Sequence, residues 1–274
     1  MGDIWAGIKT AEDFEPTEKQ VRCETHGVYT SNHILGRQWS GCPGCLTDER
    51  RRIEAEQQAE AQVRTAEHKA RRLRSAGCIG RFEAATFETW HAKTPEQRRV
   101  LARVRTFSDE LTATGTDGAG LILIGPPGTG KTHLLCAVVR HVLQTPFLLQ
   151  HKGQAHKCGR VAAVITAQAL VRKLRECWKR DTEESEAEVI EHYGKDCELL
   201  ALDDVGASFG SEAEQVQLLE VLDMRYRLQR PTVIASNLAL PDIPRAIGER
   251  AFDRLREGAT VLPCTWASHR GQKS

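Results

Sequence analysis

The chain has 274 residues, of which 40% are hydrophobic, and its formal net charge is +1 at pH 7. This length predicts one full domain with a smaller module, and the hydrophobic content is enough for a packed core. No apolar stretch approaches the roughly 20 residues of a membrane span, and residues 1–10 lack the basic start and apolar core of a signal peptide, so no membrane partner is expected. Nine cysteines without an export signal argue against a disulfide framework and predict a reducing, cytoplasmic setting. Any contact with DNA must come from a local patch, since the net charge is close to zero.

The sequence divides into three parts, which cover residues 1–47, 48–76 and 77–274. The first part contains four potential metal ligands in two short pairs, Cys23 and His26 followed by Cys42 and Cys45. Two residues separate the members of each pair and fifteen separate the pairs, so the four side chains can surround Zn²⁺ tetrahedrally. A set with His33 in place of His26 has poorer spacing, and unrelated buried thiols are the structural alternative. Because about 45 residues bury little core, zinc would largely hold this part together.

Residues 48–76 are a charge-dense run, rich in helix-forming residues and free of glycine and proline. We predict one long helix there. Its few large apolar residues, Ile53, Val63 and Leu73, are too sparse for a packed stripe or for sustained heptads. Two interpretations stay open: a solvated spacer stabilised by ion pairs one turn apart, or an arm that docks on a partner.

Residues 77–274 alternate apolar strands with amphipathic helices. Strands are predicted at residues 121–124, 161–166, 198–203, 232–236 and 260–262. Helices are predicted from Thr132 onward, from the second strand through Trp178, and over residues 212–228. Strands that are continuously apolar and alternate with helices indicate an α/β fold with a parallel sheet covered on both faces.

The sequence GPPGTGKT directly follows the first predicted strand and leads into an apolar helix. Its residues are Gly125, Pro126, Pro127, Gly128, Thr129, Gly130, Lys131 and Thr132. The glycines permit positive φ values, which let backbone N–H groups wrap around a β-phosphate. Lys131 supplies charge to the β- and γ-phosphates, and the Thr132 hydroxyl can ligate Mg²⁺. The helix dipole also favours the anion, so the pattern predicts that the chain binds a nucleoside triphosphate such as ATP.

Two carboxylates, Asp203 and Asp204, end the third predicted strand, at the sheet edge where open α/β sheets bind ligands. Asp203 would hold Mg²⁺ directly or through water, and Asp204 would orient or deprotonate the attacking water. Asn237 follows the fourth strand and would sense the γ-phosphate or its water, although a turn-capping asparagine is the alternative. Three arginines follow on a later helix and can neutralise phosphoryl charge in cis or in a neighbouring subunit: Arg250, Arg254 and Arg256.

The helix after the second strand ends in a group of cations around one tryptophan. The cations are Arg172, Lys173, Arg175, Lys179 and Arg180. Bases of single-stranded DNA can stack on the indole of Trp178 while phosphates meet Arg175 and Lys179. The alternative is that Trp178 packs back onto the domain and that the charges form a solvated face.

These motifs, in this order, resemble those of the bacterial and phage DnaC-type helicase loaders, which are AAA+ ATPases. The resemblance extends from about Arg81 to Arg270. It is carried by RFEAATFETW, GPPGTGKTHL, VITAQALVRKLRECW, ELLALDDVG, PTVIASN and GERAFDRLREG. The segment RCETHGVYTSNHILGRQWSGCPGC also resembles the amino-terminal module of many phage-encoded members. The expected architecture is therefore a P-loop AAA+ core with a small zinc-binding module and a helical linker.

The resemblance implies a magnesium-dependent ATPase that delivers a replicative DnaB-type helicase onto single-stranded DNA and self-associates into an ATP-dependent oligomer. It implies that Arg254 is an arginine finger acting on the next subunit and that Arg270 is a second sensor. Many relatives carry Glu after the magnesium-binding Asp, whereas this chain carries Asp204. Because its carboxylate is one methylene shorter, we expect slow hydrolysis or altered positioning of water.

Three alternatives to a loader remain. An IstB-type transposition helper ATPase shares most of the ATPase motifs, and the zinc-like module favours the loader. A replication initiator is disfavoured because fewer than 20 residues follow Arg256, too few for a helical lid and a DNA-binding domain. A nucleotide-binding adaptor with little turnover belongs to a different class of function and is still open, since binding motifs do not measure hydrolysis.

Overall fold

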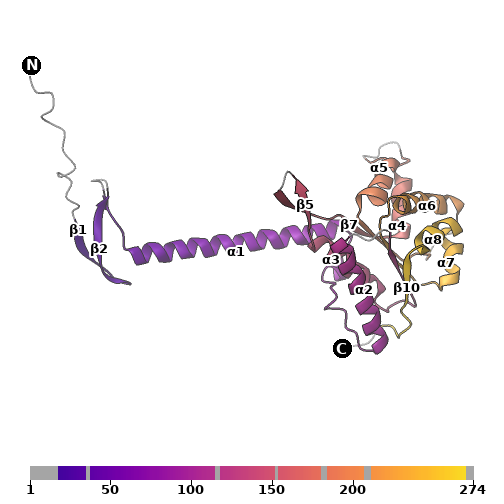
Figure 1. Ribbon diagram of the computed structural model, residues 1–274, viewed down its shortest axis with the longest axis horizontal. Helices are drawn as coiled ribbons and strands as arrows, with labels where there is room; N and C mark the ends of the chain where they lie inside the picture. The colour runs from indigo at the N-terminus through magenta and orange to yellow at the C-terminus, as the bar shows by residue number, and fades with distance from the viewer. Residues whose placement is uncertain are drawn as a thin grey trace, which may run out of the picture. The chain divides into compact units, whose positions relative to one another are not determined.

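The computed structural model describes residues 18–34, 38–114, 118–151, 154–179, 184–206 and 211–269 (Figure 1). These residues belong to two compact units, residues 1–67 and residues 68–274. Within the described ranges, no helix is both long enough and apolar enough to cross a membrane. Arg180, one of the cations predicted near Trp178, and Arg270, the predicted second sensor, lie outside these ranges.

A small antiparallel sheet forms part of the first unit. Its strands, in spatial order, are β1 (Glu18–Cys23), β2 (Gly27–Ile34) and β3 (Gln38–Trp39). Gly27 has a φ of +80° and pairs with Cys23 across the β1–β2 turn, a conformation that glycine adopts without steric cost. This turn contains His26 and therefore holds the first two predicted metal ligands close together.

A single helix, α1 (Pro43–Ser75), contains the charge-dense run, so the prediction of one long helix is confirmed. It begins at Pro43 rather than at residue 48, because proline fits the first turn of a helix, where its missing N–H is not needed. Ion pairs one turn apart lie along it, such as Arg50–Glu54 at 2.9 Å and Arg64–Glu60 at 3.3 Å. Such pairs stabilise a solvated helix by about 0.2–0.5 kcal/mol each.

A five-stranded sheet lies at the centre of the second unit (Figure 1). Its spatial order is β10 (Ala259–Pro263), β4 (Gly120–Ile124), β9 (Thr232–Ser236), β8 (Leu199–Asp203) and β7 (Ala162–Thr166). Every pairing in it is parallel. The prediction of a parallel α/β sheet is therefore confirmed, and each predicted strand is found within about one residue of its expected ends.

Helices cover both faces of this sheet. One face carries α2 (Pro95–Thr114) and α3 (Lys131–Gln144). The other carries α4 (Ala167–Glu176), α5 (Glu186–Glu191), α6 (Glu212–Arg227), α7 (Ile243–Ile247) and α8 (Glu249–Arg256). Because successive strand side chains point to opposite faces, Leu121 and Leu123 of β4 pack with α3, whereas Ile122 packs in the second core. Because both faces of the sheet are covered, the strand sequences are apolar at successive positions.

Some elements of the second unit were not predicted. They include the antiparallel hairpin of β5 (Phe147–His151) and β6 (Gln154–Cys158) and the π-helical turn η3 (His192–Asp196). The η3 turn is fixed by Arg225 of α6, whose buried guanidinium donates to the carbonyl oxygens of Tyr193 at 2.7 Å and Cys197 at 2.8 Å. Burial lowers the pKa of Arg225 to about 9, so the cation persists at neutral pH.

Candidate nucleotide-binding cleft and metal centre

The loop of residues 125–132 joins β4 to α3 at the carboxyl edge of the sheet. Three of its glycines have positive φ: +146° at Gly125, +85° at Gly128 and +92° at Gly130. Only residues without a Cβ adopt such values readily, so the glycines have the role that the sequence predicted for the backbone path. Gly130 caps α3, and the amino end of this apolar helix therefore opens directly at the loop.

Lys131 is buried at the mouth of this loop. Its Nζ donates to the carbonyl oxygens of Gly125 at 2.6 Å and Pro126 at 2.9 Å. It also donates to Oδ1 of Asn237 at 2.8 Å. The ammonium group is thus held where the loop, α3 and the end of β9 meet, which places the predicted sensor beside the predicted phosphate-binding lysine.

Asp203 and Asp204 lie next to this lysine, at the end of β8. Burial raises the pKa of Asp203, while a hydrogen bond with the Thr132 side chain opposes this shift. Asp204 is exposed and has a φ of +50°, a left-handed conformation that aspartate tolerates better than most residues. The side-chain amide of Asn237 donates to Oδ1 of Asp204 at 3.3 Å. The Thr132 hydroxyl and the buried Asp203 carboxylate therefore face each other, and the exposed Asp204 carboxylate lies beside them.

All of these side chains line one cleft of about 580 Å³. The cleft also has lining residues that the sequence patterns did not single out, namely Arg81, Phe82, His133 and His269. The guanidinium of Arg81 lies 4.8 Å from the centre of the Phe82 ring. The spacing of a phosphate loop gives no signal for these residues, because they come from segments far away in the sequence or from just beyond the motif.

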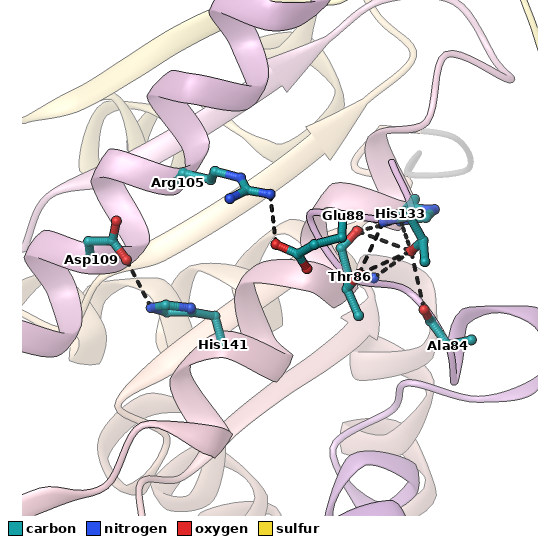
Figure 2. Close-up of polar contacts among 8 residues, drawn as sticks. Ala84, Thr86, Glu88, Arg105, Asp109, His133 and His141 are labelled. Atoms are coloured by element: carbon teal, nitrogen blue, oxygen red, sulfur yellow. Dashed lines mark hydrogen bonds and ion pairs between the residues drawn. The ribbon is translucent and has the colours of Figure 1, made fainter. Parts of the chain in front are cut away.

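The lead-in segment, residues 81–90, is fastened along α3 (Figure 2). His133 Nε2 lies 2.9 Å from the Thr86 carbonyl oxygen, and burial lowers the pKa of this imidazole. Because a carbonyl oxygen can only accept, His133 makes this hydrogen bond with its proton on Nε2. Glu88 also pairs with Arg105 of α2, with Oε1 2.7 Å from the guanidinium (Figure 2). These contacts tie RFEAATFETW to α3, which begins at the phosphate loop, and to α2.

Arg254, the predicted finger, does not line the cleft of its own chain. Its Nε lies 3.2 Å from Oδ1 of Asp223, and its guanidinium stacks 4.5 Å from the centre of the Tyr226 ring. Arg250 also lies outside the cleft lining. Within one chain, the structure therefore brings no arginine of α8 to the predicted phosphate site.

The predicted DNA contacts lie at the end of α4 and just after it. The Trp178 side chain is 63% exposed, and its Nε1 donates to Glu186 at 2.8 Å, so the ring does not pack into the domain core. Arg175 pairs with Glu214 at 3.2 Å, and Lys179 is exposed. The patch therefore combines an open indole with cations, and acidic side chains lie beside it.

The four predicted metal ligands converge in the first unit. The ligand atoms of Cys23, His26, Cys42 and Cys45 all lie within 4.8 Å of one another. Sγ of Cys23 and Sγ of Cys45 are 3.4 Å apart, and Nδ1 of His26 is 3.4 Å from Cys45 Sγ. A tetrahedral zinc site with Zn–S bonds of about 2.3 Å has S···S edges of about 3.8 Å, so the cluster has nearly the size that zinc requires.

The imidazole of His26 is oriented by an acidic partner that was not predicted. Its Nε2 lies 2.8 Å from Oδ2 of Asp48, in the first turns of α1, so Nδ1 is the atom that faces the thiols. Hydrogen bonds with His26 lower the pKa of Cys23 to about 6, and thiolate is the form that binds metal. A carboxylate on the far nitrogen of a histidine ligand is the usual arrangement around protein zinc.

Comparisons with known proteins place these features in a family. The model of the IstB-like ATP binding protein family matches residues 50–274. Among curated proteins, the replicative helicase loader DnaC of Escherichia coli (strain K12) is 26% identical over 190 residues, which cover 68% of this chain and 69% of that protein. The DnaC of Buchnera aphidicola subsp. Schizaphis graminum is 27% identical over 186 residues, with the same coverage.

Solved structures agree on the fold. The crystal structure of the DnaC helicase loader superimposes with a TM-score of 0.53 at 22% identity, covering 65% of this chain and 96% of that one. AMPPCP-bound DnaA from Aquifex aeolicus gives 0.51 at 22% identity, covering 65% of this chain and 49% of that one. The predicted resemblance to DnaC-type AAA+ proteins, and the close similarity to IstB-type ATPases, are therefore confirmed. The chain belongs to the IstB-like ATP binding protein family of AAA+ ATPases.

Proposed function

We propose that this protein is an ATP-dependent loader, which delivers a replicative DnaB-type helicase onto single-stranded DNA in the cytoplasm. The similarity to curated helicase loaders over 68% of the chain is the observation that carries the proposal. The cleft that combines Lys131, Thr132, Asp203, Asp204 and Asn237 supports an ATP-driven step. All nine cysteines are free thiols, which suits a reducing compartment.

For ATP, we assign each side chain of the cleft a role. Lys131 meets the β- and γ-phosphates, and Asn237 senses the γ-phosphate from the neighbouring strand end. Thr132 and Asp203 fit Mg²⁺, because a hydroxyl and a buried carboxylate already face each other there. When bound, Mg²⁺ would neutralise charge on the phosphate oxygens. Asp204 orients or deprotonates the attacking water, and its hydrogen bond with Asn237 couples this step to the sensor.

Co-purification with the replicative helicase, with and without ATP, tests the proposal. The helicase is expected to bind the full chain, and ATP is expected to change the amount retained. The Lys131→Ala variant should bind the helicase but lose the response to ATP. If no helicase co-purifies in any nucleotide state and a transposase does, the IstB-type transposition helper, whose family model also matches the chain, replaces the loader.

Hydrolysis distinguishes a loader from a nucleotide-binding adaptor. Turnover is to be measured with Mg²⁺ in the absence and in the presence of single-stranded DNA. Measurable hydrolysis that responds to the DNA supports the loader. Binding of ATP without turnover under both conditions favours the adaptor, and the short Asp204 carboxylate would then be the first residue to examine.

We further propose that Cys23, His26, Cys42 and Cys45 hold one structural Zn²⁺. Three thiols and one imidazole form a closed ligand set, which leaves no position for a substrate and is typical of structural zinc. The described residues of the first unit form a small sheet and include few buried apolar side chains, so the metal would contribute much of its stability. Asp48 would act from outside the ligand set by fixing the His26 ring.

Purified full-length protein is expected to contain about one zinc per chain by elemental analysis. The Cys42→Ser, Cys45→Ser double variant should lose the metal, whereas Cys158→Ser, outside the cluster, should keep it. Asp48→Asn should weaken zinc binding roughly 10- to 100-fold in a chelator competition. Zinc retained by the double variant would show that another set of residues binds it.

For single-stranded DNA, we propose that Trp178 stacks on a base while Arg175 and Lys179 meet phosphates. The open indole supports this role, and the hydrogen bond with Glu186 holds the ring at the surface. Self-association would place such patches from several subunits along one strand. ATP between subunits would control this assembly.

Replacing Trp178 with alanine is expected to weaken binding of a labelled oligonucleotide about 5- to 150-fold, because stacking contributes about 1–3 kcal/mol per base. Fluorescence anisotropy measures the loss, and ATP affinity should not change. Trp39→Ala, in the first unit, is the matched control. Equal DNA affinity of the Trp178→Ala variant and the wild type would make Trp178 a surface residue without this role.

A further inference from the structure

Three successive carbonyls of the phosphate loop accept hydrogen bonds from two distant segments. The Gly128 carbonyl accepts from the backbone N–H of His269 at 2.9 Å. The Thr129 carbonyl accepts from Nε1 of Trp266 at 2.9 Å. The Gly130 carbonyl accepts from Nε1 of Trp90 at 3.2 Å. Three successive loop carbonyls therefore accept from other segments, and the Gly130 carbonyl also accepts the first helical hydrogen bond of α3, from the Leu134 N–H at 3.1 Å.

The direction of these carbonyls sets the direction of the N–H groups that follow them. In a trans peptide, the C=O and the next N–H point in opposite directions, and no cis peptide occurs in the described chain. The N–H groups of Gly130 and Lys131 therefore point away from the two indoles, and the Thr129 N–H points away from the His269 N–H. The side opposite these donors is the inner side of the loop. Inward N–H groups are what a phosphate-binding loop uses to hold phosphate oxygens.

The two indoles are themselves fixed. Trp90 and Trp266 are 6% and 8% exposed, and their rings meet edge-to-face with centroids 5.8 Å apart. A Cβ on Gly130 would lie 2.5 Å from Trp90 Nε1, so the loop fits against Trp90 only because residue 130 is glycine. Likewise, a Cβ on Gly125 would lie 2.2 Å from the Cys264 carbonyl oxygen, in the segment that carries Trp266. The loop and its two supports are built as one packed unit.

We propose that Trp90 and Trp266 are positioning residues for the nucleotide phosphates. The Trp266 indole N–H holds the Thr129 carbonyl, and the Trp90 indole N–H holds the Gly130 carbonyl together with the Leu134 N–H of α3. The N–H groups of Gly130 and Lys131 are thereby directed at the phosphates before nucleotide binds. Preorganisation of this kind reduces the ordering that binding would otherwise require. The inference rests on the assignment of residues 125–132 to the triphosphate.

Phenylalanine tests the hydrogen bonds separately from packing, because it keeps an aromatic ring and lacks the donor. In full-length Trp90→Phe and Trp266→Phe, the affinity for ATP and for ADP is expected to fall about 2- to 12-fold, as for loss of one neutral hydrogen bond. Calorimetry measures both affinities, and Trp39→Phe is the control. Unchanged affinities in both variants would overturn the inference and leave the indoles as packing residues, whatever the change in thermal midpoint.

If the phenylalanine variants fail to fold, a measurement on the wild-type protein still tests the inference. The protein has five tryptophans, so labelling with ¹⁵N-tryptophan gives five indole N–H signals, and Trp39→Phe and Trp178→Phe each remove one. Among the remaining signals, the indole protons of Trp90 and Trp266 should exchange slowly with solvent, and both signals should shift when ATP is added. No slow, ATP-responsive signal would overturn the inference. Unchanged ATP affinity in Lys131→Ala would instead refute the phosphate-loop assignment itself.

Discussion

Replacing Lys131 with alanine is expected to weaken binding of ATP in the presence of Mg²⁺ at least about tenfold. The ammonium group is buried at the mouth of the phosphate loop, 2.6 Å from the Gly125 carbonyl oxygen and 2.8 Å from Asn237. A charge-assisted hydrogen bond to phosphate contributes roughly 1.5–3 kcal/mol, which corresponds to about a 10- to 150-fold change in affinity. Isothermal titration calorimetry on the full chain measures the loss.

The variant should stay folded, because water can reach the oxygens that Lys131 leaves in an open cleft. Its thermal midpoint without nucleotide provides this check. Lys195→Ala is a suitable control, since Lys195 pairs with Glu191 on the surface far from the loop in sequence. A folded Lys131→Ala protein that binds ATP as tightly as the wild type would contradict the assignment of the loop.

The sheet and the cleft could be predicted from local patterns because each pattern has a direct physical cause. The strands of a covered parallel sheet must be apolar on both faces, so Leu199–Asp203 and Thr232–Ser236 stand out in the sequence. Parallel strands end at the same edge, which is why Asp203, Asp204 and Asn237 come together with Lys131 in one cleft. Their chemical roles stay predictions until nucleotide binding and turnover are measured.

The residues that hold the cleft and its neighbouring segments in place could not be predicted, because they act through contacts between segments that are distant in the sequence. Trp90 lies 40 residues before the carbonyl it contacts, and Trp266 lies 137 residues after its own. The guanidinium of Arg225 is buried against backbone carbonyls, and nothing in the local pattern of α6 separates it from the exposed Arg227 two residues later. Asp48 lies in the charged helix as predicted, but its contact with His26 could not be predicted, because His26 lies in the earlier β1–β2 turn.

The Arg254→Ala variant is expected to retain ATP affinity and to lose hydrolysis by roughly 10³-fold, the lower end of the effect of an arginine finger. Arg254 does not line the cleft of its own chain. Asp223 and the Tyr226 ring hold its guanidinium on the surface formed by α6 and α8, and the side chain is only partly exposed. A finger held on one subunit in this way can act only on the cleft of another. ATP affinity depends on the phosphate loop and should therefore be unaffected.

Mixing two inactive proteins tests whether Arg254 acts between subunits. In a hybrid interface, a Lys131→Ala subunit supplies an intact Arg254, and an Arg254→Ala subunit supplies an intact cleft. Some hydrolysis should therefore return in the mixture, measured as phosphate release over a range of mixing ratios. Arg227→Ala is the matched control, because Arg227 also pairs with Asp223, at 2.9 Å, but is well exposed. A wild-type rate for Arg254→Ala would make Arg254 an ordinary surface residue, and Arg250 would become the next candidate for the finger.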